Sequence, residues 1–222
     1  MTAASIALID YGAGNLTSVK KALAAIGAPV FVPASPGALD GAGAIIVPGV
    51  GHFDATRALD RAWIDAILER VGEGRPLLGI CLGMQWLFEG SDEAPDVPGL
   101  GVLSGQCRRL RVPPEGHEGT KTRRRSGHEN GPEARLKIPH VGWNSIDRTR
   151  DASILEGVAP GAQVYFTHSY IAPLTGDTVA STEHGEAFAS VVERGQIAGV
   201  QFHPEKSAET GLKILRNFVS SV

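Results

Sequence analysis

Short apolar runs alternate with helical repeats of apolar residues in the first half of the chain. Four stretches are short, apolar and bounded by turn residues, as strands are: 6–9, 30–32, 42–51 and 76–80. Two stretches carry apolar residues at helical spacing: 16–26, which Gly27 ends, and 55–71. Strands that alternate with helices predict an α/β fold with a parallel sheet covered on both faces, where ligands bind at the carboxyl ends of the strands.

The second half of the chain has a different pattern. Strands are expected within six segments joined by short turns: GVLSGQCRRLRV, VGWNSI, QVYFTHSYIA, TVASTEHG, FASVVERG and IAGVQFHP. A last helix is expected over residues 208–219. The sequence therefore predicts a mostly parallel sheet followed by additional strands with hairpin-like connections.

Composition narrows the class of protein. The chain has 222 residues, 42% of them hydrophobic, which fits a single domain over residues 1–222. A net charge of -3 gives no general attraction to nucleic acid or to an anionic membrane. The first residues lack a basic stretch followed by a long apolar one, and no 18 apolar residues are consecutive, so we expect a cytoplasmic protein. Cys81 and Cys107 lack metal-ligand spacing, so reduced thiols and no metal are expected.

One segment is rich in glycine, proline and charge and has no apolar periodicity. From Arg108 to Lys137 there are nine Lys and Arg and four Glu, a local charge of 9 − 4 = +5. We interpret residues 113–135 as a mobile loop or hairpin insertion. A solvated loop and a contact to phosphate or a partner are both compatible with this composition.

Cys81 stands between two glycines where an apolar strand meets a helix. In the G-x-C-x-G arrangement, Gly79 and Gly83 leave room for a sharp turn that lifts the thiol clear of the sheet. The start of the following helix favours a thiolate, and the Leu82 N–H points where an oxyanion would form. A cysteine packed as a small apolar residue is the alternative, so the motif requires a base elsewhere.

His203 is the candidate base among seven histidines. It follows an apolar strand in GVQFHPE, and Glu205 lies two residues further on. A histidine and a carboxylate on one turn can act as a base and its orienting group. The alternative is a strand-end histidine with a structural hydrogen bond. His117, His128 and His184 lie in loops or turns and are expected to be exposed.

These motifs resemble a known family. GICLGMQ and QFHPEKS resemble the Cys-His-Glu triad of class I glutamine amidotransferases. DYGAGN, PGVGHF, PHVGWN and YFTHSY further resemble the glutaminase subunits of imidazole glycerol phosphate synthase, and the likeness extends from Asp10 to Ser207. The resemblance implies a three-layer αβα, flavodoxin-like fold and hydrolysis of L-glutamine to glutamate and ammonia, without a cofactor.

The resemblance also implies roles for individual residues. Cys81 would form a thioester with the substrate, His203 would transfer the proton to ammonia, and Glu205 would orient the imidazole. The oxyanion hole would use the Leu82 N–H and the turn at Val50 and Gly51, whose peptide could flip as a switch. Glutamine would be bound by these residues: Gly51, Gln85, Glu93, His168, Ser169 and Tyr170.

A partner protein follows from the same resemblance. In the family, ammonia passes to a (β/α)₈-barrel cyclase, which makes imidazole glycerol phosphate and aminoimidazole carboxamide ribonucleotide in histidine biosynthesis. The positions that match its partner face are Asn15, Trp143, Tyr165 and Lys206. A heterodimer is therefore expected, with glutamine hydrolysis nearly silent until the cyclase is loaded.

Three other readings are compatible with parts of the sequence. Gly12 and Gly14 follow the first strand as in dinucleotide-binding proteins, but Thr17 stands where the third glycine is required. A stand-alone cysteine hydrolase, or an amidotransferase of another class I branch, would share the triad without the partner-facing motifs. A non-catalytic module would bind glutamine without turnover.

Overall fold

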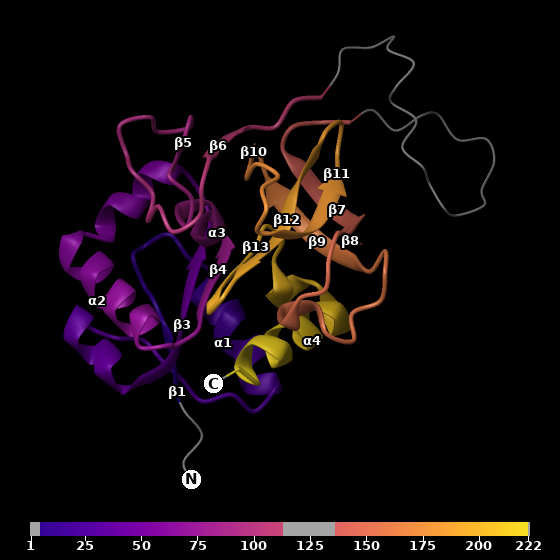
Figure 1. Ribbon diagram of the computed structural model, residues 1–222. Helices are drawn as coiled ribbons and strands as arrows, with labels where there is room; N and C mark the ends of the chain where they lie inside the picture. Colours follow the sequence, from indigo (N-terminus) through magenta and orange to yellow (C-terminus); the bar gives the residue numbers. More distant parts are fainter. Residues whose placement is uncertain (1–4, 113–135, 222) are drawn as a thin grey trace.

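An eight-stranded mixed sheet forms the central layer of the computed structural model, which describes residues 5–112 and 136–221 (Figure 1). Its strands are β1 (Ser5–Leu8), β2 (Val30–Phe31), β3 (Ala42–Gly49), β4 (Leu77–Cys81), β8 (Asp147–Arg148), β11 (Thr178–Glu183), β12 (Ala187–Arg194) and β13 (Ile197–Val200). Their spatial order is β2-β1-β3-β4-β13-β12-β11-β8. The five strands from β2 to β13 are parallel, in the order typical of flavodoxin-like folds, and β12, β11 and β8 add antiparallel pairs. The predicted sheet is confirmed.

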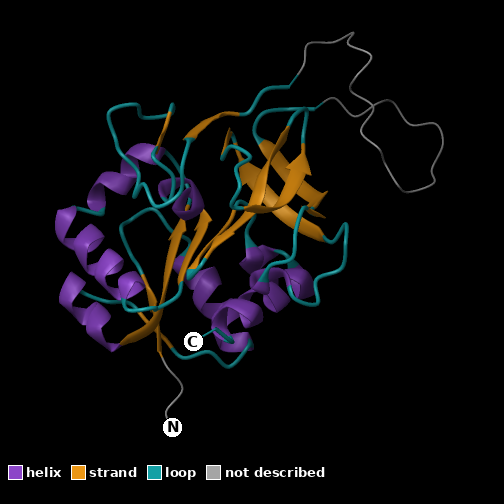
Figure 2. Cartoon of the chain, in the orientation of Figure 1, coloured by secondary structure: helices purple, strands orange, loops and turns teal. Residues whose placement is uncertain are grey.

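Helices cover both faces of the sheet. The four α-helices are α1 (Leu16–Ala25), α2 (Arg61–Gly72), α3 (Leu82–Trp86) and α4 (Ala208–Val219). Because side chains alternate along a strand, Ile6 and Leu8 share an apolar cluster with α1 and α4, whereas Ala7 and Ile9 share one with α2 and α3. Figures 1 and 2 show α2 on one side of the sheet and α1 and α4 on the other. The expected three-layer αβα arrangement follows.

Two small sheets lie beside the ends of the central strands. One consists of β5 (Gly90–Ser91), β6 (Gln106–Arg109) and β10 (Tyr170–Ile171), and the other pairs β7 (His140–Ser145) with β9 (Gln163–His168). The His203 N–H donates to the Tyr165 carbonyl at 2.9 Å, which joins β9 to the segment that follows β13. The segments expected as strands in the second half therefore contribute to three different sheets.

The prediction of one helix over residues 55–71 is wrong at the start of that helix. Residues Phe53–Ala58 form a separate 3₁₀ turn, η2, and α2 begins at Arg61. The Asp60 carboxylate accepts the Trp63 N–H at 3.1 Å, so it caps a new helix and interrupts the expected one. The helix predicted over 208–219 is confirmed as α4. The insertion interpreted over 113–135, with His117 and His128, lies outside the described residues.

Within residues 5–112 and 136–221, no helix combines the length and the apolar character needed to cross a membrane.

Candidate active site

Cys81 occupies a strained turn between β4 and α3, the elbow formed by residues 79–83. Its φ of +54° lies in the left-handed region, which side chains other than glycine seldom adopt. A Cβ on Gly79 would lie 2.5 Å from the Gly83 carbonyl oxygen, and one on Gly83 would overlap the Val47 carbonyl. Both glycines are therefore required for the close approach of β3, β4 and α3, as the G-x-C-x-G motif predicts.

The candidate base, His203, and its candidate orienting group, Glu205, lie just beyond the end of the neighbouring strand. β13 pairs with β4 in parallel, with Val200 opposite Ile80, so His203 follows the strand end next to Cys81. His203 Nδ1 lies 2.9 Å from Glu205 Oε1, and the side chains are only 2% and 1% exposed. Ser207 fixes this turn, because its hydroxyl donates to the His203 carbonyl at 2.6 Å and accepts the Tyr165 N–H at 2.9 Å.

The charges around His203 favour its protonated form. Burial lowers the pKa of His203, but its interactions with Cys81 and Glu205 raise it more, to about 10. His203 Nε2 is buried and has no hydrogen-bond partner among the described residues. The imidazole is therefore available to exchange a proton with the Cys81 sulfur or with a substrate bound to it.

The candidate oxyanion donors, at Leu82 and in the turn at Val50 and Gly51, differ in whether their N–H groups are already hydrogen-bonded. Leu82 is the first residue of α3, so its N–H has no partner within the helix. The Val50 N–H instead donates to the Ala13 carbonyl at 2.5 Å, and Gly51 has a φ of +103°. In this conformation the Val50 N–H is therefore engaged, whereas the Leu82 N–H at the start of α3 has no partner within its helix.

The candidate glutamine-binding residues fall into two groups. Gln85 Nε2 donates to the Tyr170 carbonyl at 3.0 Å, which joins Gln85 to the segment of His168 and Ser169. Glu93 accepts the Phe53 N–H at 2.8 Å and lines an open pocket with residues of η2. The groups are linked by the apolar cluster that holds Leu82 next to Phe53 and Ala94.

Three of the four partner-face candidates form one surface cluster. The rings of Trp143 and Tyr165 are T-shaped at 6.1 Å between centroids, and Lys206 Nζ lies 5.8 Å from the Tyr165 ring centroid. Trp143 is 54% exposed although it is a large apolar side chain. Asn15 is instead engaged as the cap of α1, where its side chain accepts the Ser18 N–H at 3.3 Å.

One residue beside Cys81, Gln201, was not identified from the sequence, and the expectation for His184 was wrong. Gln201, completely buried, places its amide nitrogen 3.7 Å from the Cys81 sulfur. A polar residue within the apolar run GVQF was the available signal. His184, expected to be exposed, is only partly exposed and stacks on the buried His140 at 4.0 Å between ring centroids.

The second cysteine differs from the first. Both cysteines are free thiols. Burial raises the pKa of the Cys107 thiol well above its usual range, and its sulfur donates to the Gln85 carbonyl at 3.6 Å. No group of three or more His, Cys, Asp and Glu in the described part of the chain is arranged to hold a metal ion.

This fold, with a cysteine at the elbow after β4 and a His-Glu pair on the turn that follows β13, is that of a class I glutamine amidotransferase. Residues 7–222 match the family described as "Glutamine amidotransferase class-I". A solved chain titled "Crystal structure of glutamine amidotransferase" shares the fold with a TM-score of 0.69 at 20% identity, over 97% of both chains. "Structure of PurLQS from Thermotoga maritima" gives a TM-score of 0.69 at 16% identity, over 99% of both chains.

Sequence comparison narrows the family further. The chain is 45% identical to "Imidazole glycerol phosphate synthase subunit HisH" of Gloeobacter violaceus, over 97% of this chain and 88% of that protein. The subunit HisH of Moorella thermoacetica is 43% identical, over 96% of this chain and 93% of that protein. That of Xanthomonas axonopodis pv. citri is 42% identical, over 96% of each. The chain belongs to the HisH family of class I glutamine amidotransferases.

Proposed function

We propose that this chain is the glutaminase subunit of imidazole glycerol phosphate synthase and hydrolyses L-glutamine to glutamate and ammonia. The observation that carries the proposal is the position of Cys81. It lies at positive φ beside the buried His203, whose Nδ1 is engaged by Glu205 and whose Nε2 is free of other described partners. A strained nucleophile with an oriented base is the arrangement that acyl transfer requires.

The reaction proceeds in two steps. The Cys81 sulfur attacks the carboxamide carbon of glutamine, and His203 Nε2 gives its proton to the departing ammonia, which leaves a glutamyl thioester. His203 then takes a proton from water as the water attacks the thioester carbon. Glutamate leaves and the thiolate is restored. Glu205 keeps the imidazole oriented through both steps because its carboxylate accepts from Nδ1.

Substrate binding uses polar groups near the elbow. The Glu93 carboxylate suits the α-ammonium group of glutamine, since it is partly exposed in an open pocket. Gln85 has both N–H groups engaged by Tyr170 and Gln201, so its carbonyl oxygen is the atom left for the substrate. The backbone at Gly51, His168 and Ser169 completes the proposed pocket.

A second oxyanion donor requires a change in the turn at Val50 and Gly51. The Val50 N–H must leave the Ala13 carbonyl before a backbone N–H of this turn can face Cys81. Gly51 permits such a rotation because it lacks a Cβ. Loss of one oxyanion donor typically slows acyl transfer by about 10²- to 10³-fold, so the turn can act as a switch.

The proposed partner is the (β/α)₈-barrel cyclase subunit, in a heterodimer. The exposed cluster of Trp143, Tyr165 and Lys206 offers an aromatic anchor with a positive charge beside it, and Asn15 lies at the start of α1. Ammonia released into water would be protonated and lost as a nucleophile, so hydrolysis is best coupled to the loaded cyclase. The chain would then serve histidine biosynthesis in the cytoplasm.

An isotope competition tests the proposal. The complex with the cyclase subunit is given its nucleotide substrate, amide-¹⁵N glutamine and an equal concentration of unlabelled ammonium. Channelled ammonia predicts imidazole glycerol phosphate that is almost wholly ¹⁵N-labelled with the native chain, and unlabelled product with Cys81→Ala. Glutamate release without labelled product would instead support a stand-alone cysteine hydrolase.

A further inference from the structure

Gln201 is a completely buried polar side chain that contacts the proposed nucleophile and has no role in the proposed reaction. We propose that Gln201 is a positioning residue for the Cys81 sulfur, held in place by a chain of hydrogen bonds that ends at Asn144 on β7. The inference rests on the proposed function in taking Cys81 as the nucleophile. It adds a neutral donor that stabilises the thiolate and fixes its direction.

The contact with sulfur is a directed one. Gln201 Nε2 donates to Cys81 Sγ at 3.7 Å, whereas the contact of this sulfur with the Thr167 carbonyl is longer, at 4.0 Å, and His203 interacts with the sulfur from the neighbouring turn. Gln201 Oε1 accepts a hydrogen bond from Gln85 Nε2 at 3.1 Å. Because the oxygen of the amide is engaged by Gln85, its NH₂ group faces the sulfur. A donor at this position stabilises a thiolate more than a thiol.

Gln85 extends the network away from the nucleophile. Its second N–H donates to the Tyr170 carbonyl at 3.0 Å, and the same carbonyl accepts from His168 Nδ1 at 2.9 Å. His168 therefore carries its proton on Nδ1 and accepts on Nε2. His140 Nδ1 lies 3.1 Å from that Nε2 and must be the donor.

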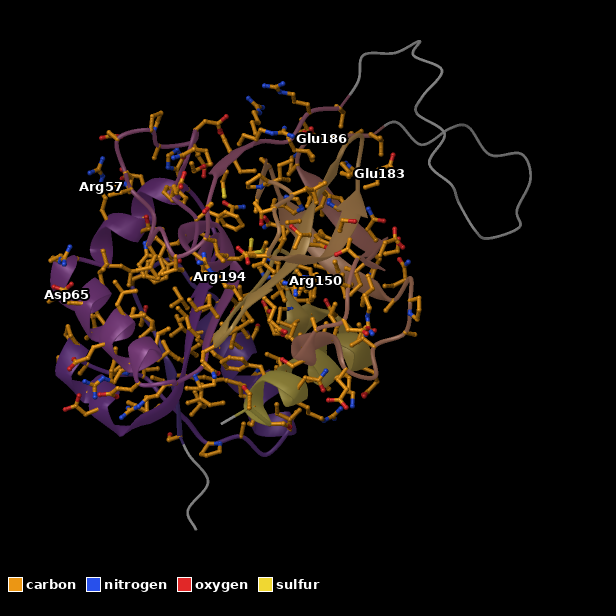
Figure 3. The ribbon with its side chains drawn as sticks, in the orientation of Figure 1. Arg57, Asp65, Arg150, Glu183, Glu186 and Arg194 are labelled. Carbon is orange, nitrogen blue, oxygen red and sulfur yellow. The ribbon has the colours of Figure 1, made fainter. Side chains whose placement is uncertain are left out.

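Asn144 completes the chain at β7. Its Nδ2 donates to His140 Nε2 at 3.3 Å and to the Glu183 carbonyl at 3.0 Å. Glu183 is the last residue of β11 and is labelled in Figure 3. Each donor in this series of hydrogen bonds meets an acceptor in only one combination of His140 and His168 tautomers. Burial lowers the pKa of His140 to about 2 and that of His168 to about 4, so both stay neutral near pH 7 and the directions of the bonds are fixed.

The network connects a surface strand with the reacting sulfur. On β7, His140 and Asn144 point inward, whereas Val141 and Trp143 are 57% and 54% exposed. Through His140 and Asn144, the strand with this exposed apolar surface is therefore connected by hydrogen bonds to Gln201, which contacts the Cys81 sulfur.

The test measures thiol reactivity and needs neither glutamine nor a partner. The full chain is alkylated with iodoacetamide, and modification of Cys81 is followed by peptide mass spectrometry. Gln201→Met retains length and removes the donor. Its alkylation rate at pH 7 should fall by up to about tenfold, the effect of losing one hydrogen bond to a charged group, and the difference from the native rate should be smaller at pH 9.5, because alkaline pH favours the thiolate in both proteins.

Ser190→Ala is the matched control. Ser190 is buried on the neighbouring strand, its carbonyl accepts the Gln201 N–H, and its hydroxyl has no partner among the described residues. It should alkylate as the native chain does at both pH values. Equal rates for Gln201→Met and the native chain at pH 7 would overturn the proposal, as would an equal loss at both pH values, which would indicate changed access. If Gln201→Met does not fold, Gln201→Leu takes its place.

The far end of the network is tested with Asn144→Asp, which retains the oxygen acceptor and removes both donated hydrogen bonds. A two- to threefold fall in Cys81 alkylation at pH 7 is expected, and no change would limit the proposal to Gln201 and Gln85 by overturning the part that reaches β7. Failure of the proposed function is separate: a complex that releases no glutamate, with alkylation behaving as stated, would reject the glutaminase and leave this network in place.

Discussion

His203 Nδ1 and Glu205 Oε1 lie 2.9 Å apart with both side chains almost completely buried. This pairing leaves Nε2 as the only nitrogen of the ring that can exchange protons with Cys81 or the substrate. It also raises the pKa of His203, together with Cys81 and against the effect of burial. The imidazole proposed as the base is thus held in one orientation, and its protonated form is favoured.

Replacing the carboxylate should weaken the base without unfolding the chain. Glu205→Gln should lower kcat for glutamine hydrolysis by about 10- to 100-fold, because a hydrogen bond to a charged group contributes about 1.5–3 kcal/mol. KM for glutamine should change little. Glu209→Gln is the control, since this carboxylate is exposed on α4. Steady-state kinetics of the complex measure kcat and KM for both variants. Equal kcat for the two variants would contradict the assigned role of Glu205.

The elbow makes a prediction about stability. In Gly83→Ala the new methyl group would overlap the Val47 carbonyl, so the free energy of unfolding should fall by roughly 1–3 kcal/mol. Gly72→Ala, also in a helix but with open space at its Cβ position, should instead be stabilising by up to about 1 kcal/mol. Urea unfolding measures both. Similar effects of the two substitutions would show that the helix, and not the close approach to β3, determines the need for glycine.

The elements of the fold were predictable where a local pattern is strong. The buried strands of the first half and helix α4 follow from runs and spacings of apolar residues. The elbow was predictable because Gly79, Cys81 and Gly83 are close in sequence. Asp60 shows the limit: the apolar spacing continues through it, but its side chain caps a new helix and divides the expected one.

The buried histidines predict acid sensitivity. The pKa values of His140 and His168 are lowered by burial, to about 2 and about 4, so the unfolded chain binds protons that the folded chain does not once the pH falls below about 6.5. Each should then reduce stability by about 1.4 kcal/mol per pH unit as the pH falls. His203 has the opposite effect on stability because its pKa is raised. Its contribution to the free energy of unfolding is complete below pH 6.5 and is lost as the pH rises through about 10.

Urea unfolding from pH 6 to pH 4.5 checks this slope. His140→Asn should lose about 1.4 kcal/mol per pH unit less than the native chain does, because one of the two histidines is gone while the carboxylates are unchanged. Parallel pH profiles for the two proteins would mean that His140 is protonated in the folded chain.

The aromatic surface cluster predicts an effect on assembly. Trp143→Ala should weaken binding to the cyclase subunit by at least 2 kcal/mol, roughly 30-fold, because a large exposed aromatic at an interface is a typical hot spot. Its free energy of unfolding should change little, since the side chain is 54% exposed. Leu174→Ala is the control, since its apolar side chain is 53% exposed and makes none of the contacts that join Trp143, Tyr165 and Lys206. Titration calorimetry measures the affinity of each variant for the cyclase subunit. Native affinity in both variants would contradict the assignment of the Trp143 cluster to the partner interface.

The polar network around the site could not be predicted in the same way. Gln201, Gln85, His168 and His140 are far apart in sequence, and their partners are fixed only when β13, α3, β9 and β7 come together. The state of the oxyanion turn is also a tertiary property, because the Val50 N–H has found the Ala13 carbonyl, on another loop. Residue types identify the candidates, but the contacts decide which groups are free.

In the proposed function Cys81 releases ammonia from glutamine for a partner enzyme, and each turnover also releases one glutamate, which can be measured. The rate is determined for the chain alone, with the cyclase subunit, and with the cyclase subunit loaded with its nucleotide substrate. A gated ammonia donor should show a low rate for the chain alone and a rise of about 10²-fold or more with the loaded cyclase, as the second oxyanion donor forms, and Cys81→Ala should be inactive. Full activity of the chain alone, unchanged by the loaded cyclase, would contradict it.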